Sequence, residues 1–305
     1  MLIAIDHGNS AIKTIHTNFT AGLTSYPVKP PFGDDVIQFN NEYWALTGNR
    51  MPYMRNKTKD IRYFILTLFA IAKETLETNS QTPEMNIDLA VGLPPEHYSA
   101  QKDEFATYFK ENGRNAKFIY NDAAICINIR KVFVYPQAFA AVAPQSQVIS
   151  AMPRVYIIDV GGYTVDILLL RNGKPDLQFC RSLEMGVITM NNEIIGKINA
   201  QHDIKIEDDH IADVLNNRET ILPKTVQLDI REMAESYANN IIYKLRELQI
   251  DLKANPSIFM GGGSALFKPY IEGSPMVTKA DFIPTINANA IGYDKMGSAQ
   301  SKKST

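Results

Sequence analysis

Two short apolar runs, each stopped by a polar turn that contains glycine, open the two halves of the chain. The first run begins at residue 2 and meets its turn at residues 6–10, after which apolar and polar positions alternate. The same order returns in residues 155–170, with the turn at residues 159–164. Alternation on both sides of a glycine turn is typical of a β-hairpin. The pattern therefore predicts two hairpins, and their repetition predicts two related domains.

Other segments have apolar residues at helical spacing or in short extended runs. Residues 60–77 carry apolar side chains three and four positions apart, which predicts a helix. The same reasoning predicts helices at residues 95–112, 136–142, 187–199 and 229–248, and strands at residues 87–91, 117–120, 123–134, 177–183 and 257–260. The mixture of strands and helices predicts an α/β protein.

Length and charge limit the class of protein. A chain of 305 residues with 45% hydrophobic residues is long enough for two compact domains. Lys and Arg (31) nearly balance Asp and Glu (33), which leaves a net charge of -2. Because nucleic-acid surfaces depend on clustered basic residues, we expect no direct binding of nucleic acid.

Cysteines and apolar runs exclude further classes. Cys126 and Cys180 are far apart and lack CxxC spacing, so we predict neither a disulfide framework nor a zinc site. The apolar run at residues 155–170 contains two aspartates, and the other long run is too short to span a bilayer. The first residues lack a basic leader followed by a long apolar stretch. We therefore expect a cytoplasmic protein without a membrane partner.

Three glycine turns, each directly after an apolar strand, carry the candidate chemistry. They lie at residues 6–10, 159–164 and 261–263, and none has the spacing of a Walker loop or of GxGxxG. A triphosphate needs backbone amides that it can approach closely, and Mg²⁺ needs carboxylates that hold it directly or through its waters. Asp6 and Asp159 precede the glycines of the first two turns. If the two hairpins face each other across a cleft, both aspartates converge on the metal.

Each turn has a simpler interpretation. A glycine turn alone is more often only the end of a hairpin, and Asp6 alone is more often a surface aspartate. Three such turns in this order favour a nucleotide site. Ser10 and Lys13 add a hydroxyl and a positive charge to the first hairpin. For Asp166 the simpler interpretation is stronger, because strand alternation alone predicts that it faces solvent.

Several motifs resemble those of bacterial plasmid-segregation actins of the ParM type, within the superfamily of actins, sugar kinases and chaperone ATPases. IDHGNSAIK (residues 5–13) resembles the first phosphate hairpin, and IIDVGGYTVDI (157–167) resembles the second. VFVYPQAFAA (132–141) is similar to the connecting helix, and IFMGGGSA (258–265) to the adenosine motif. NAIGY (289–293) is similar to the second connecting segment.

The resemblance implies an α/β, actin-like (ribonuclease H-like) fold with two domains whose mixed five-stranded sheets flank a nucleotide cleft. Domain I would comprise residues 1–150 with a C-terminal return at 286–300. Domain II would comprise residues 151–285, with a small outer lobe at about 201–225. Residues 298–305 would form a flexible tail.

The resemblance also implies a site for ATP and Mg²⁺, with GTP left open as the nucleotide. Gln137, at the start of the connecting helix, would face the attacking water and orient it by hydrogen bonds, since glutamine is not a strong base. Asp159 and Asp6 would complete the catalytic set and hold the metal. Tyr163 stands where related turns usually carry a small or hydroxyl residue. The residues implied in nucleotide binding are Gly8, Asn9, Ser10, Lys13, Gly161, Gly162, Tyr163, Thr164, Gly186, Gly261, Gly262, Gly263 and Ser264.

The function implied is an ATPase that polymerises with ATP into dynamic filaments and segregates plasmid DNA through a DNA-bound adaptor of the ParR type. One alternative is a small-metabolite kinase of the same superfamily, which would need a carboxylate base on the substrate side. Another alternative is the same ATPase with a different cargo, as in a chaperone or a cell-shape actin. The short chain after residue 297 disfavours a chaperone. The absence of an amphipathic N-terminal segment disfavours a cell-shape actin. A dehydrogenase is disfavoured by the absence of GxGxxG.

Overall fold

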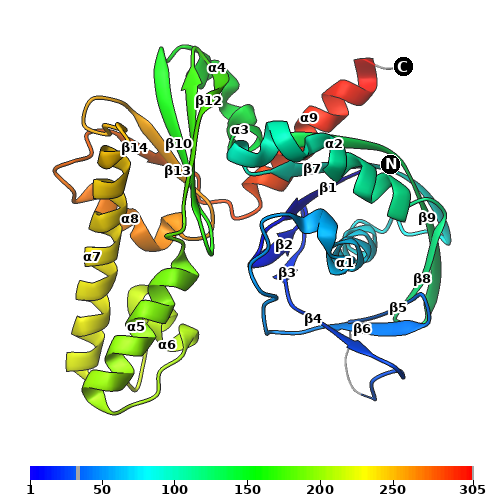
Figure 1. Cartoon of the computed structure of the whole chain (residues 1–305), viewed down its shortest axis with the longest axis horizontal. Coiled ribbons are helices and arrows are strands. Elements are labelled where there is room, and N and C mark those ends of the chain that lie inside the picture. The colour runs from blue at the N-terminus through cyan, green and yellow to red at the C-terminus, as the bar shows by residue number, and fades with distance from the viewer. Residues whose placement is uncertain (32–34, 304–305) are drawn as a thin grey trace. The chain divides into compact units, whose positions relative to one another are not determined.

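The computed structural model describes residues 1–31 and 35–303 and divides the chain into two compact units (Figure 1). Unit 1 comprises Met1–Ser146 and Asn287–Thr305, and unit 2 comprises Gln147–Ile286. Each unit has its own sheet and its own hydrophobic core. The predicted α/β class is confirmed.

Unit 1 is built on a mixed sheet with the strand order β3-β2-β1-β7-β9-β8-β5-β6-β4. The strands β1, β7 and β9 are parallel, and the remaining neighbours pair antiparallel. The bounds are β1 (Leu2–His7), β2 (Ala11–Lys13), β3 (Asn18–Thr20), β4 (Leu23–Tyr26), β5 (Val36–Phe39), β6 (Glu42–Leu46), β7 (Glu84–Leu93), β8 (Ala116–Tyr120) and β9 (Ala123–Pro136).

The sheet of unit 1 is wider than the five strands predicted. Its first five strands, from β3 to β9, form the expected mixed sheet, and β8, β5, β6 and β4 extend it to nine among the described residues. The extension consists of hairpins with short connections, such as β5 with β6 and β8 with β9, that are joined by the antiparallel pairing of β5 with β8 from distant parts of the chain.

Helix α1 (Arg62–Glu77) is the centre of the core of unit 1. Every residue from 63 to 72 is buried, as expected for a helix that is apolar on all sides. Figure 1 shows the strands of unit 1 curving around it. The helix α2 (Pro95–Asn112) packs on β7 and β9, and α9 (Ala288–Lys303) packs on β1, β7 and α3 (Phe139–Val142). The described part of the unit also contains the short 3₁₀ helices η1 (Lys57–Lys59) and η2 (Ala143–Gln145).

Two predicted boundaries in unit 1 need correction. The helix predicted at residues 136–142 begins only at Phe139, because β9 continues to Pro136 and Ala138 has a positive φ of 62°. The tail predicted to be flexible from residue 298 is helical to Lys303. Within this part of the helix, the side chain of Gln300 accepts a 2.9 Å hydrogen bond from the Tyr135 hydroxyl. Residues 304–305 of that predicted tail lie outside the described residues.

Unit 2 contains a mixed sheet of five strands in the order β12-β11-β10-β13-β14. The strands β10 and β11 form the predicted second hairpin, and β13 lies parallel to β10. The bounds are β10 (Arg154–Val160), β11 (Val165–Arg171), β12 (Lys174–Leu183), β13 (Ser257–Met260) and β14 (Ala280–Phe282), with helices α4 (Ser146–Ser150), α5 (Val187–His202), α6 (Asp208–Leu215), α7 (Lys224–Glu247) and α8 (Ser264–Glu272).

Helices cover one face of this sheet and close the core of unit 2. Alternate residues of β10, such as Tyr156 and Ile158, belong to one cluster with buried residues of α5 and α7. The segment predicted as a small outer lobe, residues 201–225, holds α6, whose Ile211 and Val214 are buried in that same cluster. Among residues 1–31 and 35–303, no helix combines the length and apolar character needed to cross a membrane.

Candidate functional site

The first hairpin brings three of the predicted residues of unit 1 together. Asp6 on β1 is paired with Lys13 on β2, so the two side chains lie on one face of the hairpin. Lys13 Nζ is 3.9 Å from Asp6 Oδ2, and Gln137 Nε2 donates a 2.8 Å hydrogen bond to Asp6 Oδ1. Asp6 is buried rather than a surface residue. The structure therefore brings Asp6, Lys13 and Gln137 together within unit 1.

The contact with Asp6 determines how the Gln137 side chain is oriented. Gln137 follows directly after β9, and its backbone amide donates to the carbonyl of Leu93 at the end of β7 over 2.8 Å. An ionised carboxylate only accepts hydrogen bonds, so the amide nitrogen of Gln137 faces Asp6 and the amide oxygen points away from it. That oxygen is the group that can accept a hydrogen bond from a water molecule.

The first turn presents its backbone amides. Among the described residues, the amides of Gly8, Asn9 and Ser10 have no hydrogen-bond acceptor. A Cβ at Gly8 would lie 2.6 Å from the carbonyl oxygen of Ala11, so only glycine fits there. Consecutive amides of this kind form a concave site for an anion.

The side chain of Asn9 has a different role from its amide. Asn9 Oδ1 accepts hydrogen bonds from the Tyr63 hydroxyl at 2.8 Å and from the Met54 amide at 3.2 Å. The side chain thereby ties the turn to α1, which leaves the backbone as the part of Asn9 that can contact a phosphate.

The second turn is fixed to the start of α5. The amides of Gly186, Val187 and Ile188 donate to the carbonyls of Tyr163, Gly161 and Gly162 at 3.0, 3.1 and 2.7 Å. These bonds satisfy helix N-terminal amides that would otherwise have no partner.

Gly186 is required for that contact. A Cβ at Gly186 would lie 2.3 Å from the carbonyl oxygen of Gly162. Within unit 2, Gly186 therefore lies against the second turn. The carbonyls of this turn face α5, whereas the amides of Gly162 and Thr164 have no acceptor in the described part of the chain.

The third turn lies against Asp159. Gly261 has a φ of +84°, and a Cβ there would lie 2.2 Å from Asp159 Oδ1. The Gly263 amide donates to the Val160 carbonyl at 3.0 Å, and the buried Ser264 hydroxyl donates to the Gly261 carbonyl at 2.8 Å. The structure thus brings the second and third turns together at the end of β10.

Asp166 is not exposed, contrary to the prediction from strand alternation. It is 8% exposed, and Thr164 Oγ1 donates to its Oδ2 at 2.9 Å. Alternation fails here because both faces of β11 are buried up to its last residue. Asp166 also pairs with Asp159 across the hairpin.

His7 is a buried polar residue of the first motif that sequence reasoning missed. Its Nε2 lies 2.8 Å from Thr67 Oγ1, and its ring packs against Phe105 and Phe109. Burial, with a smaller contribution from the positive charge of Lys57, lowers the pKa of His7 to about 3. The sequence signal for a buried His7 is that this polar residue continues an apolar strand.

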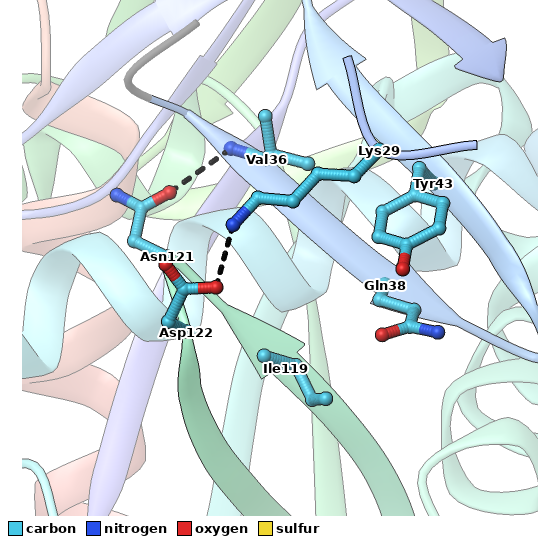
Figure 2. Close-up of a pocket in the computed structure, with 7 residues that line it drawn as sticks. All are labelled: Lys29, Val36, Gln38, Tyr43, Ile119, Asn121 and Asp122. Carbon is cyan, nitrogen blue, oxygen red and sulfur yellow. Dashed lines mark hydrogen bonds and ion pairs between the residues drawn. The ribbon is translucent and has the colours of Figure 1, made fainter. Parts of the chain in front are cut away.

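A separate pocket of unit 1 does not coincide with these residues (Figure 2). It has a cavity of about 470 Å³ and contains an ion pair of 2.6 Å between Lys29 Nζ and Asp122 Oδ1. Both side chains of that pair are more than half exposed. None of the residues predicted from the motifs lines this pocket.

The predicted residues thus form one set in each unit. In unit 1 the set is Asp6, Gly8, Asn9, Ser10, Lys13 and Gln137. In unit 2 it is Asp159, Gly161, Gly162, Tyr163, Thr164, Gly186, Gly261, Gly262, Gly263 and Ser264. Within the described ranges, no group of three His, Cys, Asp or Glu side chains is arranged to hold a metal ion.

Comparisons with known families agree with the fold. Residues 32–139 match the family described as actin like proteins N terminal domain, and residues 157–273 match the archaeal actin homologue MreB-like, C-terminal family. The fold and the paired glycine turns thus define the class, an actin-like protein of two domains. The chain has the actin-like fold that its motifs predicted, and each of its two units contains a match to an actin-like family model. A search of curated proteins by sequence found no match.

Solved structures of the same fold cover nearly the whole chain. The archaeal actin homologue Ta0583 in complex with ADP is 18% identical, with a TM-score of 0.73 over 98% of this chain and 99% of that one. A non-polymerisable quadruple mutant of pCBH ParM is 21% identical, with a TM-score of 0.71 over 98% and 99%. The AlfA filament bound to AMPPNP is 14% identical, with a TM-score of 0.63 over 99% and 98%.

Proposed function

We propose that this protein binds and hydrolyses Mg-ATP at its glycine turns and assembles into filaments that depend on the nucleotide. The observation that carries the proposal is the buried 2.8 Å hydrogen bond between Gln137 Nε2 and Asp6 Oδ1, which joins two distant motifs. The fold adds support, because neighbours of that fold are described as an ADP complex and as a filament bound to AMPPNP.

In this proposal the turns of each unit supply contacts for the nucleotide. Among residues 1–31 and 35–303, the amides of Gly8, Asn9 and Ser10 and those of Gly162 and Thr164 have no acceptor, and phosphate oxygens are suitable acceptors for them. Lys13 supplies a positive charge beside the first turn. The third turn, from Gly261 to Ser264, contacts the adenosine. Nothing in these contacts separates ATP from GTP.

The acidic residues fit a magnesium ion. Mg²⁺ in nucleotide sites is usually held by one or two carboxylates together with phosphates and waters. Asp6 and Asp159 provide such carboxylates, and the bond to Gln137 holds Asp6 in one orientation. When bound, Mg²⁺ neutralises the negative charge that develops on the phosphates during transfer.

Gln137 orients the water that attacks the terminal phosphate. Its amide nitrogen is held by Asp6, so its oxygen accepts a hydrogen bond from the water and fixes the direction of attack. A glutamine in this position contributes geometry rather than proton abstraction.

Assembly and disassembly follow from the nucleotide state. ATP favours the arrangement of the two units that polymerises, and hydrolysis weakens it, because a ligand shifts an equilibrium by its difference in affinity for two states. We propose that the filament moves plasmid DNA in the cytoplasm through a DNA-bound adaptor of the ParR type. The net charge of -2 fits an adaptor better than direct DNA binding.

Light scattering and phosphate release, recorded together after addition of Mg-ATP, test this function. We expect scattering to rise with Mg-ATP and to fall when ATP is exhausted, and to stay flat with Mg-ADP or without nucleotide. Asp159→Ala is the control and should lose phosphate release much more than nucleotide affinity.

Turnover without any rise in scattering would contradict the filament and favour the metabolite kinase. Normal phosphate release by Asp159→Ala would contradict the metal assignment.

A further inference from the structure

The turn that follows Gln137 has an unusual backbone. Ala138 has φ 62° and ψ -48°, and the Phe139 amide donates to the Gln137 carbonyl over 2.6 Å. A hydrogen bond across one central residue with a positive φ defines the rare form of the γ-turn, which is strained for any residue with a Cβ. Strained backbone of this kind persists only when its surroundings hold it.

The side chain of Asn289 supplies that support. The buried Ala138 amide donates to Asn289 Oδ1 over 2.9 Å. Asn289 lies in the first turn of α9, 151 positions away in the chain, and is itself buried. On the other side, the Gln137 amide is bound to the carbonyl of Leu93. The turn is thus held from two directions inside unit 1.

The backbone of α9 is fixed at a short distance from this turn. A Cβ at Gly292 would lie 1.9 Å from the carbonyl oxygen of Ala140, and a Cβ at Gly92 would lie 2.0 Å from the Tyr293 hydroxyl. Both glycines permit a contact that no other residue allows. Asn289 therefore reaches the Ala138 amide from a helix that has little freedom to shift.

We infer that Asn289 is a positioning residue for hydrolysis, an inference that rests on the proposed ATPase function. Its side chain stabilises the positive φ of Ala138 and so fixes the direction in which the backbone presents Gln137. Without that bond, Ala138 relaxes toward a negative φ. Gln137 then rotates, and its amide leaves Asp6 Oδ1.

The first test compares Mg-ATP hydrolysis and nucleotide affinity in Asn289→Ala. A small displacement of a group that orients a reactant lowers the rate by up to about 100-fold. We expect kcat to fall toward that extent, whereas the Kd for Mg-ADP stays at the wild-type value because the glycine turns are unchanged.

A second substitution distinguishes positioning from support of the fold. Glycine adopts a positive φ without strain, so in the double variant Asn289→Ala with Ala138→Gly the turn no longer needs the Asn289 bond. We expect this double variant to recover much of the lost kcat. Loss of the docking of α9 would not be repaired by Ala138→Gly.

Asn287→Ala is the matched control. Asn287 lies two residues earlier, and its side chain donates to the carbonyl of Ile15 over 3.2 Å instead of contacting the turn after Gln137. We expect this variant to keep the wild-type kcat even if its melting temperature falls. Should Asn289→Ala fail to fold, Asn289→Asp keeps an acceptor oxygen for Ala138 and is expected to hydrolyse near the wild-type rate.

The outcomes separate the inference from the function on which it rests. A wild-type protein that does not hydrolyse Mg-ATP contradicts the proposed function. Hydrolysis by the wild type together with an unchanged kcat in Asn289→Ala overturns the inference alone. It is also overturned if the double variant is no faster than Asn289→Ala, or if a folded Asn289→Asp is as slow as Asn289→Ala.

Discussion

His7 shows that a polar residue within a motif proposed to bind nucleotide can serve the fold. It lies between Asp6 and Gly8, yet its side chain is fully buried among Phe105, Phe109 and Thr67. An imidazole in such surroundings is favoured in its neutral form, because burial penalises the charged form. His7 therefore packs behind the first glycine turn, and its lowered pKa makes the stability of the fold depend on pH.

The expected pH dependence can be derived from the lowered pKa of His7. Its pKa is about 3 in the folded chain against an ordinary value of 6.5. Between these values the unfolded chain binds a proton that the folded chain does not, so His7 lowers stability as pH falls below 6.5 and has no effect above it. The slope approaches about 1.4 kcal/mol per pH unit. Urea unfolding near pH 5 and near pH 7.5 measures this change in the free energy of unfolding.

The variant His7→Gln serves as the comparison for this prediction. It removes the titrating group and keeps a side chain that can bond to Thr67. We expect a smaller loss of unfolding free energy between the two pH values than in the wild type. Equal losses in the two proteins would show that other groups, and not His7, produce the pH dependence.

The residues that sequence reasoning found differ from those that it missed in how far along the sequence their contacts lie. Asp6 and Asp159 were predictable because each directly follows an apolar strand and precedes a glycine turn. Asn289 was placed in a segment similar to the second connecting segment, but no role was assigned to it, because its partner Ala138 is 151 positions away in the sequence. Asp166 was misplaced because the burial of both faces of β11 depends on helices elsewhere in unit 2.

At the scale of elements, the third turn contains three glycines with different functions. Gly261 has a positive φ and lies against Asp159, and Gly263 would place a Cβ 2.5 Å from the Val187 side chain. A Cβ at Gly262 meets nothing within 4 Å among the described atoms. The first and last glycines of the turn are thus needed to connect β13 to α8, whereas the middle one leaves room beside the turn.

This difference predicts separable effects of substitution. Gly261→Ala should lower the unfolding free energy by about 1–3 kcal/mol, the cost of forcing a residue with a Cβ into that backbone region. Gly262→Leu should change it by no more than about 0.5 kcal/mol and should weaken nucleotide binding strongly, because the side chain enters the space assigned to the ligand. Urea unfolding and nucleotide titration measure the two effects. Unchanged affinity in Gly262→Leu would exclude the third turn from the nucleotide site.

Local periodicity predicted most elements, and contacts distant in sequence explain the differences. The helix at residues 60–77 and the two hairpins were predictable, because apolar spacing and glycine turns are local signals. The width of the sheet in unit 1, nine strands among the described residues, was not predictable. It depends on the pairing of β5 with β8, where Ile37 lies opposite Tyr120, and local periodicity does not reveal such a partner.

At the scale of the whole molecule, the residues proposed to bind nucleotide are divided between two units. Each unit has its own core and its own glycine turns. A ligand shifts an equilibrium between two states by its difference in affinity for them. If ATP and the product of hydrolysis differ in that affinity, as the proposed function requires, we expect the filament to report the state of the nucleotide.

Gln137→Ala should separate assembly from disassembly. The variant keeps every glycine turn, so Mg-ATP should still bind and scattering should still rise. Without the amide that orients water, hydrolysis should slow by about 100-fold, and scattering should remain high long after the wild-type signal has fallen.

Because Gln137 also contacts Asp6, nucleotide affinity must be measured in the same variant to show that binding is intact. A wild-type decay of scattering in a variant that binds normally would remove Gln137 from hydrolysis, and disassembly would then need a cause other than the loss of the terminal phosphate.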